Sequence, residues 1–167
     1  MHYNVLVMGS DSGILRNLGI FAHIDAGKTS LTERILFLAG RLRAPGSVDS
    51  GTTATDFLPV ERERGITVKA ACVRLEWKGR GINLIDTPGH IDFGSEVERS
   101  LRVLDSAVIV LCAVAGVQSR TEAVLRAAAR RDLPRLAFIN KLERRGSSFL
   151  EAAGELKALV PGLIPLC

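Results

Sequence analysis

Short apolar runs alternate with stretches of helical periodicity along most of this 167-residue chain. Residues 18–21 predict a buried strand, and the apolar side chains after Thr29 recur at helical spacing, so a helix should follow directly. Residues 107–114 and 136–139 predict two more buried strands, with a helix over residues 121–131 between them. This order is typical of an α/β fold, in which a mainly parallel sheet is covered by helices.

One part of the pattern has the period of an antiparallel hairpin. Apolar and charged residues alternate over 73–77, and a glycine-containing turn at 79–81 leads into the apolar run 82–85. A last helix is predicted over 147–159, and residues 163–166 predict a further strand after it. The expected sheet is thus mostly parallel, with one antiparallel hairpin strand.

Two segments lack this periodicity. Residues 41–64 contain glycines and prolines among charges, and they predict a long functional loop that acts as a switch. Residues 1–16 contain Asp11 and a single arginine, so they lack the arginine-rich, acid-poor composition of a mitochondrial transit segment. We interpret 1–16 as an N-terminal extension of unassigned role and 17–167 as one domain, which suits the length.

Composition narrows the possible classes of protein. A hydrophobic share of 47% with 24% charged residues suits a globular core, and no apolar run approaches the roughly 20 residues of a membrane-spanning helix. Cys72, Cys112 and Cys167 have no metal-binding or redox spacing, which indicates free thiols. The net charge of +4 permits an anionic partner, but the sequence contains no DNA-binding motif. We expect a soluble monomer with no membrane or DNA partner.

Residues 22–29 read AHIDAGKT and match the Walker A spacing GxxxxGK(S/T), except that Ala22 replaces the first glycine. Backbone N–H groups of such a loop and the positive end of the next helix hold phosphates, Lys28 reaches the terminal phosphates, and the Thr29 hydroxyl binds Mg²⁺. An ordinary strand-to-helix turn is the alternative, but the order of strand, loop and helix favours a P-loop. The candidate phosphate-binding residues are Ala22, His23, Ile24, Asp25, Ala26, Gly27, Lys28, Thr29 and Ser30.

A second motif, DTPGH, follows the second strand of the predicted hairpin. Asp86 is placed to hold Mg²⁺ through water, and Gly89 is placed to offer its N–H to a γ-phosphate, so this loop would sense that phosphate. A plain strand end with a Pro-Gly turn is the alternative. The candidate nucleotide-binding residues of this motif are Asp86, Thr87, Pro88, Gly89 and His90.

The long loop ends in the sequence RGIT at residues 64–67. Thr67 is placed to give Mg²⁺ a second protein oxygen when a γ-phosphate is bound, which would make the loop a switch. Taken alone this sequence is not diagnostic, because a glycine before a β-branched strand start is common. With the two motifs above, the predicted magnesium ligands are Thr29, Thr67 and Asp86.

The sequence NKLE follows the predicted strand 136–139 and is close to the guanine-reading pattern NKxD. A carboxylate at the last position accepts two hydrogen bonds from guanine that adenine does not offer. Here Glu143 replaces Asp, and its longer side chain should weaken GTP binding by about 1–3 kcal/mol without a change to ATP. A helix start that binds no ligand is the alternative. The candidate guanine-binding residues are Asn140, Lys141, Leu142 and Glu143.

Together these motifs resemble the G domain of the elongation factor G group of translational GTPases. The similar segments read AHIDAGKTSLTERIL, ERERGITV, NLIDTPGHIDF and EVERSLRVLD. The sequence is most similar to the ribosome-recycling type of mitochondrial elongation factor G, and it is almost as similar to ribosomal protection proteins. The resemblance implies a three-layer P-loop GTPase fold that ends before the fifth motif of the family. It also favours the mitochondrial matrix over the cytoplasm as the compartment.

The resemblance further implies roles and partners. By analogy with the family, His90 would orient the attacking water, while Ile24 and Ile66 would form the apolar gate that restrains His90. The ligands would be GTP or GDP with Mg²⁺, the ribosome with its large-subunit rRNA would activate hydrolysis, and ribosome recycling factor would be a further partner. The alternative is a truncated or degenerate nucleotide-binding module without significant turnover, because Glu143 departs from the motif.

Overall fold

The computed structural model describes residues 15–46, 71–87 and 95–166. The described elements, in chain order, are β1 (Arg16–Ala22), α1 (Lys28–Leu38), β2 (Ala71–Trp77), β3 (Arg80–Asp86), α3 (Ser95–Leu101), β4 (Ser106–Cys112), α4 (Ser119–Ala129), β5 (Arg135–Asn140) and α5 (Phe149–Leu159). No helix within these ranges is long and apolar enough to cross a membrane.

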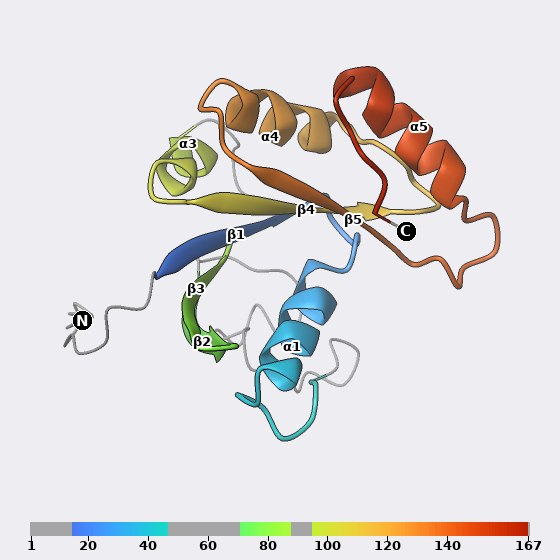
Figure 1. Ribbon diagram of the computed structural model, residues 1–167. Coiled ribbons are helices and arrows are strands. Elements are labelled where there is room, and N and C mark those ends of the chain that lie inside the picture. The colour runs from blue at the N-terminus through green and yellow to red at the C-terminus, as the bar shows by residue number, and fades with distance from the viewer. Residues whose placement is uncertain (1–14, 47–70, 88–94, 167) are drawn as a thin grey trace.

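The five described strands form one sheet in the order β2-β3-β1-β4-β5. The pairs β1–β3, β1–β4 and β4–β5 are parallel, and β2–β3 is antiparallel. Helix α1 covers one face of the sheet, while α3, α4 and α5 lie on the other (Figure 1). The predicted three-layer α/β fold with one antiparallel strand is therefore confirmed. Parallel strands need a crossover connection, and the helices supply it.

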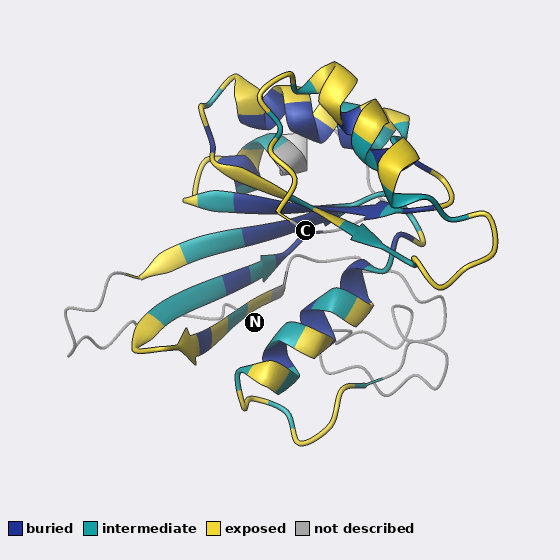
Figure 2. Cartoon of the chain, turned by 45° about the vertical axis from the view of Figure 1, so that its right-hand side comes forward, coloured by how far each residue is buried: buried dark blue, intermediate teal, exposed yellow. Residues whose placement is uncertain are grey.

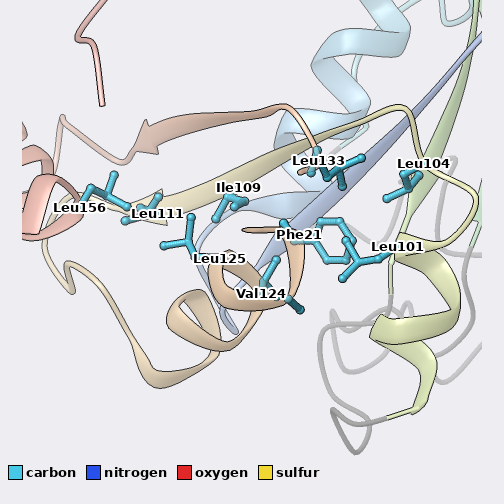
Figure 3. Close-up of a cluster of buried hydrophobic side chains, with 12 residues drawn as sticks. Phe21, Leu101, Leu104, Ile109, Leu111, Val124, Leu125, Leu133 and Leu156 are labelled. Atoms are coloured by element: carbon cyan, nitrogen blue, oxygen red, sulfur yellow. The ribbon is translucent and has the colours of Figure 1, made fainter. Parts of the chain in front are cut away.

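Each face of the sheet carries its own apolar core. On the α1 face, Ile20 and Val110 are fully buried together with Leu84 at 1% exposure. The core on the opposite face spans the whole length of the sheet (Figure 3), where Phe21 lies beside Leu101 at one end and Leu156 beside Leu111 at the other. Burial on both faces explains why the central strands read as continuous apolar runs, as Figure 2 shows in dark blue.

The β2–β3 hairpin turns more tightly than its sequence predicts. Lys78 and Gly79 both have positive φ, at 49° and 74°, and Trp77 pairs directly with Arg80. This is the geometry of a two-residue turn of type I′, whose twist matches that of the flanking strands. The sequence predicts the turn at 79–81, but Arg80 already belongs to β3 because the two-residue loop suffices.

Several elements differ from expectation. The strand at 136–139 was expected to be buried, but Leu136 is 48% and Phe138 39% exposed, because β5 is the last strand in the described sheet. Residues 163–166 form no strand; instead the Leu163 N–H donates to the Val160 carbonyl at 2.9 Å, which turns the chain at the end of α5. Strand β4 ends at Cys112 rather than 114, because the Gly116 N–H bonds the Cys112 carbonyl and closes a turn. The seven-residue helix α3 was not predicted. The predicted switch loop lies mostly outside the described residues.

Candidate nucleotide-binding site

The candidate residues that the structure describes gather at the carboxyl ends of the parallel strands. The P-loop follows β1, Asp86 ends β3, and Asn140 ends β5, while β4 lies between β1 and β5 in the sheet. Parallel strands point the same way, so the loops that follow them meet at one edge. Residues far apart in the sequence therefore form one neighbourhood.

The P-loop reaches α1 through two residues in the left-handed conformation. Asp25 has φ 58° and Gly27 has φ 95°, and α1 begins immediately afterwards at Lys28. The N-cap residue Gly27 has no side chain to cap this helix end, and the first turn of α1 contains no acidic residue. The N–H groups and the positive dipole end at the start of a helix favour an anion, so this loop-to-helix junction suits a phosphate.

Lys28 and Asp86 form a buried ion pair across the site. The Lys28 ammonium donates to Asp86 Oδ1 at 2.5 Å, and the two side chains are 9% and 2% exposed. Thr29, the adjacent candidate magnesium ligand, is 8% exposed. The pair joins the P-loop to the end of β3, as a shared site for phosphate and metal requires.

Thr87 fastens the beginning of the DTPGH loop to the central strand. Its hydroxyl donates to the Ile20 carbonyl at 2.6 Å, and the residue is 4% exposed. The loop consequently leaves β3 at a fixed point beside β1. Pro88, Gly89 and His90 lie outside the described residues.

Asn140 braces the P-loop from the neighbouring strand. Its side-chain amide donates to the Ala26 carbonyl at 3.0 Å, and the Lys141 ammonium donates to the Asp25 carbonyl. A Cβ placed on Gly27 would lie 2.2 Å from Asn140 Nδ2, so glycine is required by close approach as well as by its φ. The candidate guanine-binding segment and the P-loop are therefore joined by two hydrogen bonds.

The carboxylate expected to read guanine stands in solvent. Leu142 and Glu143 are exposed and follow Lys141, whose φ of 64° turns the chain away from β5. The loop is held by the Ser147 hydroxyl, which donates to the Leu142 carbonyl at 2.7 Å, and by Ser148, whose hydroxyl caps α5. An exposed carboxylate on a braced loop is accessible to a base, so its position suits the predicted role.

A small cavity of about 110 Å³ lies behind the P-loop. His23, Ile24 and Lys141 line it together with Thr121, which is 3% exposed. His23 Nδ1 is buried in the described structure without a hydrogen-bond partner. A larger cavity of about 580 Å³ lies between α4, β5 and α5. Its lining is mostly apolar and holds none of the phosphate-binding residues, so we place the site by its chemistry rather than by volume.

The donor set near Lys28 fits a magnesium ion held mainly by its nucleotide. Among the described residues, no three His, Cys, Asp or Glu side chains cluster as a metal-binding group. A hydroxyl from Thr29 and a carboxylate from Asp86, together with phosphate oxygens and water, match the coordination that Mg²⁺ prefers. Ile66 and Thr67 lie outside the described residues.

Sequence reasoning missed Glu33, a carboxylate that is 1% exposed within α1. Its Oε2 accepts the Gly46 N–H at 2.9 Å and so fastens the start of the long loop to the helix that follows the P-loop. Burying a carboxylate is costly unless it accepts hydrogen bonds, so the bond from Gly46 offsets part of the cost of burying Glu33. The sequence signal was an acidic residue within the helix, one position after Thr32 and three before Leu36. The structure shows that all three residues are buried.

Known proteins share this arrangement. Residues 14–161 match the protein family described as "Elongation factor Tu GTP binding domain". The chain is 57% identical over 143 residues to "Elongation factor G 2" of Streptomyces coelicolor and 55% identical over 143 residues to "Ribosome-releasing factor 2, mitochondrial" of Rattus norvegicus. Those alignments cover 86% of this chain but only 21% and 18% of the relatives.

The fold is likewise similar to that of a solved protein from Thermus thermophilus. The two structures superpose with a TM-score of 0.78 at 34% sequence identity, over 86% of this chain and 22% of the other. The chain thus spans about a fifth of the length of the relatives it matches. With the P-loop, the Lys28–Asp86 pair and the Asn140 brace in place, the chain belongs to the family of elongation factor Tu type GTP-binding domains, on its elongation factor G branch.

Proposed function

We propose that this chain binds GTP with Mg²⁺ and hydrolyses it when a ribosome completes the site, as the G domain of an elongation factor G type factor. The observation that carries the proposal is the buried ion pair between Lys28 and Asp86. The proposed phosphate-binding cation and the proposed metal-binding carboxylate lie within one hydrogen bond of each other, at the start of α1, which supports the proposal.

The nucleotide would rearrange this pair. Triphosphate oxygens would take over the Lys28 ammonium, because several phosphate charges attract it more strongly than one carboxylate does. Asp86 would then be released toward the metal, with Thr29 and Thr67 as the other protein ligands. Bound Mg²⁺ would neutralise charge on the β- and γ-phosphates. Nucleotide binding would therefore exchange one ion pair for contacts to phosphate and metal.

Rapid hydrolysis would need a partner that completes the catalytic site. His90 would orient the attacking water, and Ile24 and Ile66 would restrain His90 until the ribosome binds. Phosphoryl transfer depends on positioning and charge stabilisation, and an activating partner supplies about 10⁵ in rate in related GTPases. We therefore propose slow turnover by the chain alone and stimulation by the large ribosomal subunit.

Binding and turnover are tested in two steps. Fluorescent GDP, GTP and ATP analogues are titrated with Mg²⁺ against the chain and against Lys28→Ala. Guanine nucleotides should bind better than ATP, and the variant should lose most of that affinity. Phosphate release from GTP is then measured with and without purified ribosomes. Equal affinity for GTP and ATP, or no effect of Lys28→Ala, contradicts the proposal.

Glu143 favours a second candidate, a module that binds nucleotide weakly and does not turn it over. Its longer side chain would misplace the carboxylate that reads guanine. Ribosome-stimulated phosphate release in a single-turnover experiment excludes this candidate, whereas binding without any stimulated release supports it. The same experiment therefore decides between the two.

Under this proposal, the names of the relatives suggest a partner and a cellular compartment for this chain. One relative is named as a ribosome-releasing factor of mitochondria and another as an elongation factor G of a bacterium. We propose ribosome recycling, with ribosome recycling factor as a partner, ahead of translocation. The compartment would be the mitochondrial matrix or the cytoplasm. Splitting of ribosomes by a protein that contains this domain, with and without recycling factor, tests the assignment.

A further inference from the structure

The outer end of the sheet carries a cationic surface around the single tryptophan of the chain. Trp77 is 47% exposed beside the hairpin turn and pairs directly with Arg80 of β3. Directly paired residues point to the same face, with Cβ atoms about 4.5–5.5 Å apart. The indole and a guanidinium are therefore neighbours in solvent. We name the outer surface by its residues, which are Arg16, Arg41, Trp77, Lys78 and Arg80.

The remaining cations reach this surface from two other elements. Arg16 of β1 is aligned with Ile82 of β3, whose side chain packs on the α1 face, so Arg16 belongs to that face too. Arg41 comes from the segment after α1, and its Nε and Nη2 donate to the Arg74 carbonyl on β2 at 2.8 and 2.6 Å. Segments distant in sequence are thus fastened together at the outer ends of the strands, which Figure 2 shows as largely exposed.

Charge is concentrated at this end of the molecule. The outer surface has four cations, and among the described residues the carboxylate of Asp105 lies 4.0 Å from Arg16. Four cations minus one carboxylate give these described side chains a net charge of +3, against +4 for the whole chain. A modest overall charge becomes a local positive field here.

We propose that the outer surface binds single-stranded RNA. Exposed indole faces stack on unpaired bases, and the surrounding cations neutralise the phosphates of the same strand. β1 has seven residues from Arg16 to Ala22, so this surface lies about 20 Å from the P-loop. The RNA site is therefore separate from the nucleotide site. It goes beyond the proposed GTPase, and only the choice of RNA over DNA rests on the translational role.

Trp77 reports on binding without any label, because it is the only tryptophan. The chain is titrated with an oligouridylate of about ten nucleotides at about 50 mM salt, in the absence of GTP. Stacking should quench the Trp77 fluorescence, and affinity should fall as salt rises. Heparin, a polyanion without bases, and vesicles of anionic lipid are the comparison probes. Quenching by heparin equal to that by RNA, binding of vesicles alone, or no quenching by RNA overturns the proposal.

Substitutions test whether binding depends on the outer surface rather than on the overall positive charge of the chain. Arg80→Ala should weaken binding and lower the salt slope by about 0.7. Arg126→Ala on α4 removes a side chain that is 70% exposed and should change nothing, so it is the matched control. Trp77→Leu should weaken binding of fluorescein-labelled oligouridylate by about 5- to 100-fold. Equal losses for Arg80→Ala and Arg126→Ala contradict the proposal. Because GDP binding is measured separately in each variant, failure here is distinct from failure of the GTPase proposal.

Discussion

Gly27 and Asn140 approach so closely that a Cβ on Gly27 would lie 2.2 Å from Asn140 Nδ2. Asn140 uses the same nitrogen to donate to the Ala26 carbonyl at 3.0 Å. The contact joins the phosphate loop to the strand that carries the guanine-reading motif, over a separation of 114 residues. Changes on either side should thus affect both halves of the nucleotide site.

Gly27→Ala should disrupt this contact. The added methyl group would collide with Asn140, and alanine at φ 95° is strained, so we expect a loss of about 2–4 kcal/mol in stability. Nucleotide affinity should fall with it. Thermal unfolding and fluorescent GDP titration measure the two effects. Gly154→Ala in α5 is the control, because its Cβ meets nothing within 4 Å and should stabilise the helix slightly. Equal behaviour of the two variants contradicts the steric argument.

Lys28→Met should destabilise the nucleotide-free chain. It takes the ammonium away from the Asp86 carboxylate, which is 1% exposed, and breaking such a buried pair costs about 3–5 kcal/mol. Replacing both residues, as Lys28→Met with Asp86→Leu, should recover most of that loss, because the buried charge is removed as well. Urea unfolding of the two single variants and the double variant gives the coupling energy.

The exposed ion pair of Arg126 with Glu122 is the reference for that cycle. Arg126→Ala should change stability by less than about 1 kcal/mol, since solvent screens the pair. A coupling between Lys28 and Asp86 that is no larger than this would show that their contact contributes little.

Glu143→Asp should strengthen GTP binding. Restoring the shorter carboxylate places its oxygens where guanine donates two hydrogen bonds, and the gain should be about 1–3 kcal/mol. Titration with fluorescent GTP and ATP analogues measures it, and ATP affinity should stay unchanged. Glu76→Asp on β2 shortens another exposed side chain and serves as the control. An unchanged GTP affinity would mean that Glu143 does not contact the base.

Glu98 should make the contact between α3 and α4 sensitive to acid. Its carboxylate accepts hydrogen bonds from Arg131 and from Arg130, the latter at 3.3 Å, and the Arg131 bond is the main cause that holds the pKa of Glu98 below its ordinary value. Because the folded-state pKa is lowered, the pair stabilises the fold at neutral pH. That contribution fades as the pH falls from about 4.5 through the folded-state pKa.

Unfolding measured across this acidic range tests the effect of Glu98. The chain should lose more stability on acidification than Glu98→Gln does, since glutamine does not titrate. Glu122→Gln, in the exposed pair on α4, is the control and should resemble the unmodified chain. Parallel pH profiles for the chain and Glu98→Gln would contradict the prediction.

Local pattern predicted most elements and misplaced several of their ends. Continuous apolar runs identified β1, β4 and β5, and in the central strands β1 and β4 the run reflects burial on both faces. Helix α3 escaped prediction because it has seven residues and reads SEVERSL, with one apolar position every few residues. Residues 163–166 look like a strand, but a strand requires a hydrogen-bonded partner, which periodicity does not reveal.

The sequence likewise identified individual residues of the candidate site but not the contacts between them. Motif spacing identified Lys28, Asp86 and Asn140 as separate candidates, because each motif follows a predicted strand. It did not indicate that Lys28 and Asp86 pair with each other, nor that Asn140 holds the P-loop. It also passed over Glu33, whose role depends on a loop residue 13 positions away. Such roles arise from contacts between segments, which spacing within one segment does not encode.

By itself the sequence determined the class of this protein, because the order of apolar runs and the spacing of phosphate-binding residues are local properties. It also determined the departure from the family pattern at Glu143. Only the tertiary structure decided which residues act together: Lys28 with Asp86, Asn140 with Ala26, and Trp77 with the surrounding cations. The pairings of Lys28 with Asp86 and of Asn140 with Ala26 depend on the order and register of the strands, because strands that are distant in sequence become neighbours only when the sheet forms.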